Sequence, residues 1–395
     1  MKLNSSKSQV TMLMIVGLVL FIIISLVLYL SKSAVKKQSQ QNIKKSQESS
    51  IDTQPIKELV SGCIDKLAKD AIVLLGRQGG YIYSTQRGTL IDYADTDEGL
   101  FFVKNNKLNV AYNILPPRFA APPYSSESPD YPWHTFPYRT ADSNEEIFDG
   151  FFGISNMPPL NSSEGPNSIQ TQIETFIDSN MAECTHLKTF EKQGYEIIMQ
   201  PSKTSVNIGS GGVSIKSKIQ ITINNPKTNE IFNLQDFSDN VNIRLKDVYF
   251  FAKEMVENDI KNIKFDIDDP RNDRDSIRVK TFKNAFSSDD IIIVTDEESL
   301  IYGKPFEYIF ARKNRNPALY YIRNNVFQFP SGFMITYADL LQNSILRAED
   351  PDEDDYTFTI TPQLPRLLNA PQINFKVEVS DGRLSDYQII TVNRI

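Results

Sequence analysis

A run of 21 residues from Val10 to Leu30 constrains this chain more than any other feature, because it contains no charged side chain. A helix of about 20 residues spans the roughly 30 Å hydrocarbon core of a bilayer. A helix that covers a soluble core has a polar face, and this run has none. Cleaved signals usually have a shorter apolar region before small residues, whereas Leu30 is followed by SKSAVKK. The sequence therefore predicts an uncleaved N-terminal transmembrane helix at residues 10–30.

The lysines around this run bear on the orientation of the chain in the membrane. Lys2 and Lys7 precede the run and five lysines follow it, so the positive-inside rule alone would place the large domain inside. Charge has less influence on the translocation of large domains, and the folded parts have the character of a surface protein. We therefore expect a single-pass protein of the cell membrane, with residues 1–9 as a cytoplasmic tail and the bulk of the chain outside.

The charge is distributed unevenly along the chain. Residues 1–45 hold seven Lys and no acidic residue, which leaves the other 350 residues at a net charge of −14. A lysine-rich segment beside an apolar run suits anionic lipid head groups, so the lipid bilayer is an expected partner. An acidic ectodomain repels phosphates, and we therefore expect no nucleic acid partner.

The chain beyond the apolar run divides into a spacer and a folded region. Residues 31–54 are rich in Lys, Gln and Ser, which predicts a polar spacer. Residues 55–315 combine helical periodicity with alternating runs, which predicts an α+β ectodomain. The clearest local signals are three amphipathic helices, beginning at Pro55, Ile169 and Val248, and a β-hairpin over VSIKSKIQITI and IFNLQDF.

Prolines are too dense between Asn113 and Pro159 for a helix or a central strand. The segment also carries aromatic side chains, among them Tyr131, Trp133 and Tyr138. Aromatic rings stack on sugar faces and dock proline-rich peptides, so these three side chains are a candidate ligand platform. The alternative is a loop that lays its rings on its own domain.

From Asn316 the pattern becomes all-β, which predicts a separate sandwich of about seven strands over residues 316–395. The pieces NPALYYI, RAEDPDEDDYTFTITP and INFKVEVSDGRLSDYQIITV resemble the immunoglobulin-like and cadherin-like modules of cell-surface proteins. Glu353 stands where such modules usually have a glycine. The expected fold class is thus an N-terminal transmembrane helix, an α+β domain and an all-β immunoglobulin-like sandwich.

The remaining parts of the chain carry a second resemblance. The pieces QVTMLMIVGLVLFIII, CIDKLAKDAIVLLGRQGGYIY and LKDVYFFAKEMVEND are similar to membrane-anchored surface proteins of small-genome (DPANN-type) archaea whose activity is uncharacterised. This resemblance implies an architecture and a lineage, and no activity. The Gln ahead of the apolar run is loosely similar to archaeal type IV pilin signals, which leaves the subunit of a pilus-like filament as an alternative.

Residues suited to catalysis are sparse. The only histidines, His134 and His186, are about 50 positions apart, so a multi-histidine zinc site is not available. No glycine motif that cradles phosphate is present. Two glycosidase carboxylates could lie among the 49 acidic residues, because that chemistry depends on separation in space. We assign no catalytic, cofactor-binding or metal residue and expect no enzyme, with an anchored enzyme acting on surface glycans or peptides as the alternative.

Two acidic clusters offer the oxygen ligands that calcium prefers. The first spans residues 266–275 and the second residues 349–355. The second lies at the acidic turn of the immunoglobulin-like module, where the resemblance implies calcium at Asp350 and Asp352. Neither cluster has the ligand order of an EF-hand, and surface acids need no metal. We therefore expect no cofactor, with calcium at the Asp350/Asp352 turn as the alternative.

Cys63 and Cys184 are the only two cysteines. Cys63 lies in line with Leu59 and Leu67 on the first expected helix, and Cys184 lies in line with Ile177 on the second. Both thiols thus point into a shared core, and an adjacent pair outside the cytoplasm is expected to oxidise. The sequence predicts a disulfide, with two reduced core thiols as the alternative.

The order of anchor, spacer, α+β base and terminal sandwich would hold a recognition module away from the membrane. The function this favours is that of a membrane-anchored cell-surface protein with a structural, adhesive or partner-binding role. A protein or glycan at the cell surface is the expected partner.

Overall fold

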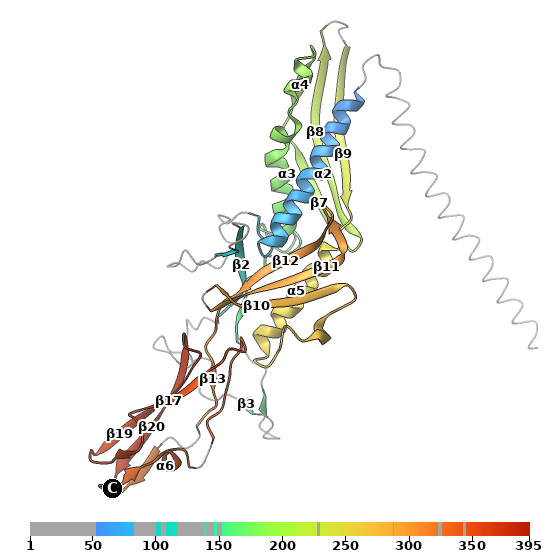
Figure 1. Ribbon diagram of the computed structural model, residues 1–395. Helices are drawn as coiled ribbons and strands as arrows, with labels where there is room; N and C mark the ends of the chain where they lie inside the picture. Colours follow the sequence, from blue (N-terminus) through green and yellow to red (C-terminus); the bar gives the residue numbers. More distant parts are fainter. Residues whose placement is uncertain are drawn as a thin grey trace, which may run out of the picture. The chain divides into compact units, whose positions relative to one another are not determined.

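Figure 1 shows the computed structural model of the chain. It describes residues 53–82, 100–103, 108–116, 138–139, 146–147, 152–226, 230–286, 288–322, 326–342 and 345–395. By its internal contacts the chain divides into two compact units, Met1–Glu58 and Leu59–Ile395. Only residues 53–58 of the first unit are described, so nearly all described elements belong to the second.

Three long helices have apolar residues at three- and four-residue spacing. They are α2 (Gln54–Arg77), α3 (Ile169–Thr185) and α5 (Leu245–Lys261), each beginning within a few residues of its predicted start. In α3 the buried side chains of Ile169, Ile173 and Ile177 recur every four positions, so one face of the helix meets the core. Ser168 begins α3 as its N-cap, because its hydroxyl accepts a 3.1 Å hydrogen bond from the N–H of Thr171.

An antiparallel sheet, here called the β6–β9 sheet, contains the predicted hairpin. Its strands are β6 (Glu196–Met199), β7 (Lys203–Gly209), β8 (Gly212–Asn225) and β9 (Glu230–Val241). β8 lies in the centre, pairing with β6 and β7 on one side and with β9 on the other. Along β8 buried and exposed residues alternate, because successive side chains of a strand point to opposite faces. The buried face packs against helices, with α3 lying on β7 (Figure 1).

A second sheet, here called the β10–β12 sheet, combines strands that precede the β6–β9 sheet in the chain with strands that follow it. Its members are β1 (Leu100–Val103), β2 (Leu108–Leu115), β5 (Ile154–Ser155), β10 (Ile277–Phe286), β11 (Asp289–Ile301) and β12 (Lys304–Arg312). All pairs are antiparallel except β12 with β2. Its core includes Val294 opposite Tyr308 and Ile292 opposite Phe310, four side chains with no exposed surface. These cross-strand apolar pairs are the unit of sheet stabilisation.

The C-terminal region is built on a four-stranded sheet in the order β14 (Val326–Phe329), β20 (Ser385–Arg394), β19 (Gln372–Ser380) and β17 (Thr357–Thr361). Two short ladders accompany it, β13 (Ala318–Leu319) with β16 (Ala348–Glu349) and β15 (Met334–Ile335) with β18 (Arg366–Leu367), together with α6 (Tyr337–Leu341). The core of this region centres on Phe375, Val377 and Ile390. The other described elements are α4 (Lys188–Glu191), β3 (Tyr138–Arg139), β4 (Glu146–Ile147) and a 3-10 turn at Pro270–Asn272.

The fold class predicted from the sequence is wrong. The described chain is mostly β with some helices, and no helix within the described residues is long and apolar enough to cross a membrane. The predicted transmembrane helix, residues 10–30, lies outside the described residues, as does most of the predicted spacer. The boundary predicted at residues 315/316 stays a prediction.

The predicted C-terminal sandwich is wrong for a local reason. Three of the segments expected to form strands do so over only two residues, in β13, β15 and β16. Pro317 directly precedes β13 and Pro351 lies two positions after β16, and proline supplies no N–H for a ladder. Alternating apolar residues alone therefore overestimate how far the pairing extends.

Candidate functional site

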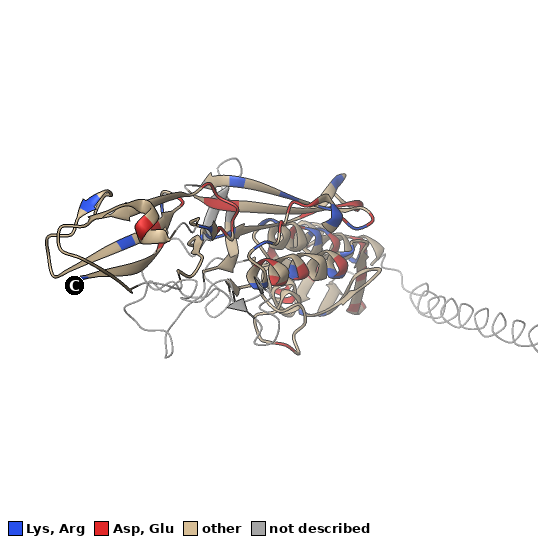
Figure 2. Cartoon of the chain, turned by 90° about the horizontal axis from the view of Figure 1, so that it is seen from below, with Lys and Arg blue, Asp and Glu red and all other residues tan. Residues whose placement is uncertain are grey.

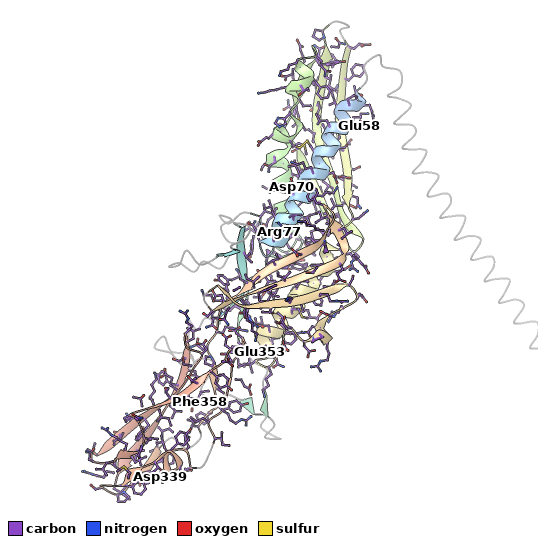
Figure 3. All side chains as sticks on the ribbon, in the orientation of Figure 1. Glu58, Asp70, Arg77, Asp339, Glu353 and Phe358 are labelled. Atoms are coloured by element: carbon purple, nitrogen blue, oxygen red, sulfur yellow. A yellow bond between two sulfur atoms is a disulfide. The ribbon has the colours of Figure 1, made fainter. Side chains whose placement is uncertain are left out.

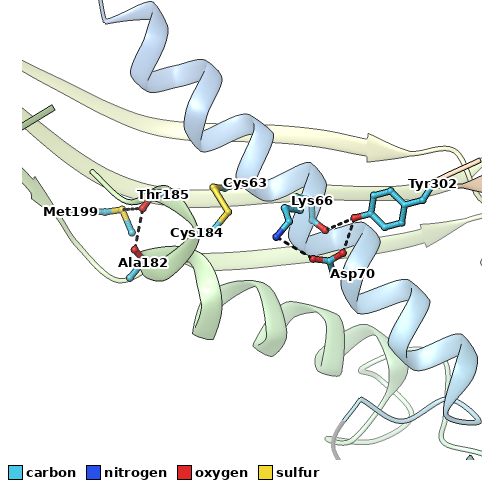
Figure 4. Close-up of a disulfide and its surroundings, with 8 residues drawn as sticks. All are labelled: Cys63, Lys66, Asp70, Ala182, Cys184, Thr185, Met199 and Tyr302. Carbon is cyan, nitrogen blue, oxygen red and sulfur yellow. Dashed lines mark hydrogen bonds and ion pairs between the residues drawn. A yellow bond between two sulfur atoms is a disulfide. The ribbon is translucent and has the colours of Figure 1, made fainter. Parts of the chain in front are cut away.

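Cys63 of α2 and Cys184 of α3 form a disulfide, with a Cα–Cα distance of 5.7 Å (Figure 4). Each cysteine lies on a helix face whose neighbours are buried, as the spacing of apolar residues predicts. Two turns further along α2, the hydroxyl of Tyr302 donates a 2.7 Å hydrogen bond to the carboxylate of Asp70. The bond and this contact brace α2 against α3 and against the turn between β11 and β12.

The predicted aromatic platform stays a prediction. Tyr131 and Trp133 lie outside the described residues. Tyr138 begins the short strand β3, of which only the backbone is described. Of the two histidines, His134 lies outside the described residues. His186 is the C-cap of α3 and has a left-handed backbone conformation.

The carboxylates of the Asp350/Asp352 turn are engaged by other groups of the protein. Asp352 accepts hydrogen bonds from Arg315, at 3.0 Å from Nε, 2.8 Å from Nη2 and 2.6 Å from the backbone N–H. Oδ1 of Asp350 accepts from the backbone N–H groups of Asp352 and Asp354, at 2.8 and 3.2 Å. No group of three or more His, Cys, Asp or Glu side chains within the described ranges is arranged to hold a metal ion. Calcium at this turn stays a prediction.

Arg315 belongs to a buried set of charges, which we call the arginine–aspartate cluster: Arg312, Arg315, Asp259, Asp290 and Asp352. The two arginines are 2% and 0% exposed. Arg312 lies 2.7 Å from carboxylate oxygens of both Asp259 and Asp290, and Arg315 lies 2.8 Å from Asp259. Buried charges are retained only when they are paired, and here each arginine contacts at least two carboxylates.

The arginine–aspartate cluster joins four elements. Asp259 comes from α5, Asp290 from β11, Arg312 from the end of β12, and Asp352 from the turn after β16. At the surface beside it, Lys283 of β10 lies 2.9 Å from the carboxylate of Glu353, a residue labelled in Figure 3. Since its charges are buried and mutually paired, the cluster fastens the acidic turn to the β10–β12 sheet and offers no open place for a ligand.

The acidic turn also contains carboxylates that ionise with difficulty. Burial, followed by the charge of Asp352, raises the pKa of Asp350 to about 7. The same two causes raise the pKa of Asp354 to about 6. Within the described residues Oδ2 of Asp350 has no hydrogen-bond partner, so no contact at that oxygen offsets the cost of burying the ionised carboxylate.

We expect the free energy of unfolding to fall as the pH rises from about 4 to about 7. An unfolded Asp ionises near pH 3.9, so between these two values the folded state binds a proton on Asp350 that the unfolded state has lost, and raising the pH favours unfolding. One unit of pKa shift corresponds to about 1.4 kcal/mol, so we expect a loss of at least about that size. Urea denaturation at a series of pH values measures it.

Asp350→Asn is the informative variant, because asparagine keeps the accepting Oδ1 and cannot ionise. We expect it to match the parent protein near pH 4 and to be more stable than the parent at pH 8. Asp339→Asn is the control of opposite sign: hydrogen bonds from Thr336 lower the pKa of Asp339, so its loss destabilises at neutral pH only. If the Asp350→Asn protein is no more stable than the parent at pH 8, the raised pKa of Asp350 is not the cause of the loss of stability.

An open hollow of about 510 Å³ lies on the exposed face of the β6–β9 sheet. Six exposed side chains line it in two rows that run across β7, β8 and β9. One row consists of Lys203, Lys218 and Asp236, and the other of Ser205, Lys216 and Ser238. We call this surface the lysine trough. Figure 2 shows basic and acidic positions interspersed on the helices, whereas the trough gathers three lysines against a single acid.

The polar side chains of the trough have no partners within the described residues, whereas two pairs further along the same face are hydrogen-bonded. Beyond one end Ser214 donates a 3.0 Å hydrogen bond to Asn240. Beyond the other end Thr222 donates a 2.9 Å hydrogen bond to Asn233. Within the part of the chain that the structure describes, none of the six trough side chains makes a hydrogen bond or an ion pair with protein. Their donors and acceptors are therefore available to a ligand.

The floor of the trough is held rigid from the opposite face of the sheet. Thr204 of β7 donates a 2.6 Å hydrogen bond from its hydroxyl to Asp178 of α3, and its hydroxyl lies 2.8 Å from that of Ser217 of β8. The backbone N–H of Val206 donates a 2.8 Å hydrogen bond to Glu174 of α3. These contacts fix the neighbours of the lysines in sequence, so the lysines extend from a preorganised frame.

The chain was compared with protein-family models and with curated proteins. No protein-family model matches the chain, and no curated protein matches it.

The lysine trough and the arginine–aspartate cluster were both missed from the sequence. The alternation Lys216-Ser217-Lys218 marks one exposed strand face, but it does not tell which strands lie beside it. The residues of the arginine–aspartate cluster come from positions 259 to 352, so no local spacing connects them.

Proposed function

We propose that this protein is a cell-surface protein that holds a partner at the lysine trough. The observation that carries the proposal is the set of six exposed polar side chains that have no partner within the described residues and lie side by side on one face of three paired strands. β7 is held to α3 by hydrogen bonds that Asp178 and Glu174 accept, and α3 is joined to α2 by the disulfide. A rigid frame with free donors and acceptors suits binding, because little conformational freedom is lost when the partner arrives.

The disulfide supports a location outside the cytoplasm. Disulfides persist in oxidising compartments and are rare where glutathione and thioredoxin keep thiols reduced. Cys63 is buried, Cys184 is partly buried, and the two are bonded to one another, which is the arrangement of a structural bridge. An extracytoplasmic location also gives the exposed trough access to protein or glycan partners of the envelope.

The arginine–aspartate cluster supports a structural side to this role. It fastens the acidic turn to α5 and to the β10–β12 sheet by buried, paired charges. Buried ion pairs are better attested as devices of conformational specificity than of net stability. We propose that this cluster keeps the C-terminal sheet in one arrangement while the trough is occupied.

A retention experiment separates binding from turnover. The full chain is immobilised and incubated with an array of labelled envelope peptides and glycans, and both the retained and the released material are analysed by mass spectrometry. We expect saturable retention of a ligand whose mass is unchanged. The release of a cleaved product would instead support the anchored enzyme, and a chain that retains no ligand saturably would overturn the proposal.

A further inference from the structure

We propose that the lysine trough binds an extended acidic peptide segment of a partner protein, whose alternate carboxylates contact Lys203, Lys216 and Lys218. This inference rests on the proposed partner-binding function and names the chemistry of the partner. It commits to one occupant because of the spacing of the charges, the identity of the other trough residues and the absence of aromatic rings from the six side chains that line it.

The spacing of the lysines matches that of an extended peptide. Lys216 and Lys218 are alternate residues of β8 on one face, so their Cα atoms lie about 6.7 Å apart. Alternate side chains of an extended peptide have the same separation, so two carboxylates at alternate positions can each meet one lysine. Lys203 lies opposite Lys218 on β7, where the Cβ atoms of a cross-strand pair are about 5 Å apart. Lys203 thus adds a second positive charge to the row that contains Lys218 and Asp236.

The remaining trough residues favour a peptide backbone between those carboxylates. Ser205 and Ser238 flank Lys216 on the two outer strands, and their hydroxyls can donate to or accept from amide groups. Asp236 lies opposite Lys218 on β9 and supplies an acceptor for a peptide N–H. The same carboxylate repels a ligand that is anionic along its whole length, which favours acidic residues interrupted by small ones over a continuous polyanion.

Other polyanions fit less well. Sugars and single-stranded nucleic acids are usually held by aromatic rings that stack on their faces. The only aromatic residue among the nine that border the trough is Phe237, and its side chain is buried on the opposite face of the sheet. The chain as a whole carries a net charge of −7, so long polyanions are repelled beyond the trough, whereas a short acidic segment meets only the lysines.

The test is a titration of the full chain with a fluorescent peptide of alternating Glu and Ser, followed by anisotropy. We expect saturable binding that weakens with added salt. Lys218→Glu should weaken it at least about tenfold, because a favourable charge contact becomes a repulsive one. Lys304→Glu is the matched control, since Lys304 is an exposed lysine at the start of β12, outside the trough, and the change in net charge is the same. We expect it to leave binding unchanged.

Asp236→Asn provides a readout that loss of folding cannot imitate. It removes the one negative charge of the trough and keeps its size, so we expect tighter binding of the peptide. Equal affinity of Lys218→Glu and Lys304→Glu would overturn the inference, as would weaker binding by a folded Asp236→Asn protein. Polygalacturonate is the probe for an acidic glycan, and its saturable binding in place of the peptide would also overturn it.

The retention experiment separates failure of this inference from failure of the proposed function. If the acidic peptide does not bind while a neutral or basic ligand is retained unchanged, the partner chemistry is wrong and the binding role stands. If nothing is retained saturably, both are wrong.

Discussion

Arg315→Met is expected to lower the free energy of unfolding by about 3–5 kcal/mol, the cost of leaving buried charges without their partner. Arg315 has no exposed surface, and its guanidinium contacts Asp352 and Asp259. Methionine fills a similar space and supplies no positive charge, so the cluster changes from three carboxylates against two cations to three against one. Urea denaturation at pH 7 measures the loss.

Arg383→Met is the matched control, because Arg383 is an exposed arginine in the turn between β19 and β20. Substitutions at such exposed positions usually change stability by no more than about 0.5 kcal/mol. Adding Asp352→Asn to Arg315→Met removes one of the stranded carboxylates and should recover part of the loss. The cluster is not the fastening that we describe if Arg315→Met costs no more than Arg383→Met.

Removal of the disulfide is expected to have an effect of similar size. Cys63 and Cys184 are 121 positions apart, and on the chain-entropy model a bond that closes a loop of that length stabilises the fold by up to about 5 kcal/mol. We expect Cys63→Ala with Cys184→Ala to lower the free energy of unfolding by about 3–5 kcal/mol, as measured by urea denaturation without reductant.

The two single variants provide an internal control for the disulfide. Either substitution alone already breaks the bond, so each should lose most of what the double variant loses, and the losses should not add. Adding a reductant should bring the parent protein close to the variants and leave the variants unchanged. Identical unfolding curves for the oxidised and reduced parent would show that the bond contributes nothing to the fold.

Local periodicity predicted the helices and the central hairpin well. α3 begins at Ile169, where the apolar spacing of four begins, and in β8 every second residue from Val213 to Ile223 is buried. The disulfide followed from the same information, because Cys63 and Cys184 each share a helix face with buried neighbours. The sequence therefore predicts a helix or strand well when one of its faces is buried and the other is exposed.

Prediction failed where the outcome depended on how separate segments pair. Apolar alternation around Met334 and Ala348 suggested full strands, but each forms a ladder of only two residues. The arginine–aspartate cluster could not be predicted for the same reason. The burial of Arg312 and Arg315 depends on α5 and on a turn that lies far from them in the sequence. A resemblance in the order of motifs did not supply these pairings.

The candidate site shows both limits together. The exposed face of β8 is readable from Lys216 and Lys218, and a solvated charged strand is the ordinary interpretation of such alternation. The trough arises only when β7 brings Lys203 beside Lys218 and β9 brings Asp236 to the other side. A binding surface that crosses three strands depends on the register of their pairing. A shift of one residue would turn the side chains of the shifted strand to the opposite face of the sheet.

Our central proposal is that the chain presents an open lysine trough outside the cytoplasm on a disulfide-bonded frame. The most direct measurement treats intact cells expressing the full chain with a membrane-impermeant amine reagent, then identifies the modified peptides by mass spectrometry without reduction. We expect modification of Lys203, Lys216 and Lys218 before lysis, together with a disulfide-linked pair of peptides that contain Cys63 and Cys184. Modification of the three lysines only after lysis, with both cysteines recovered as free thiols, would contradict it.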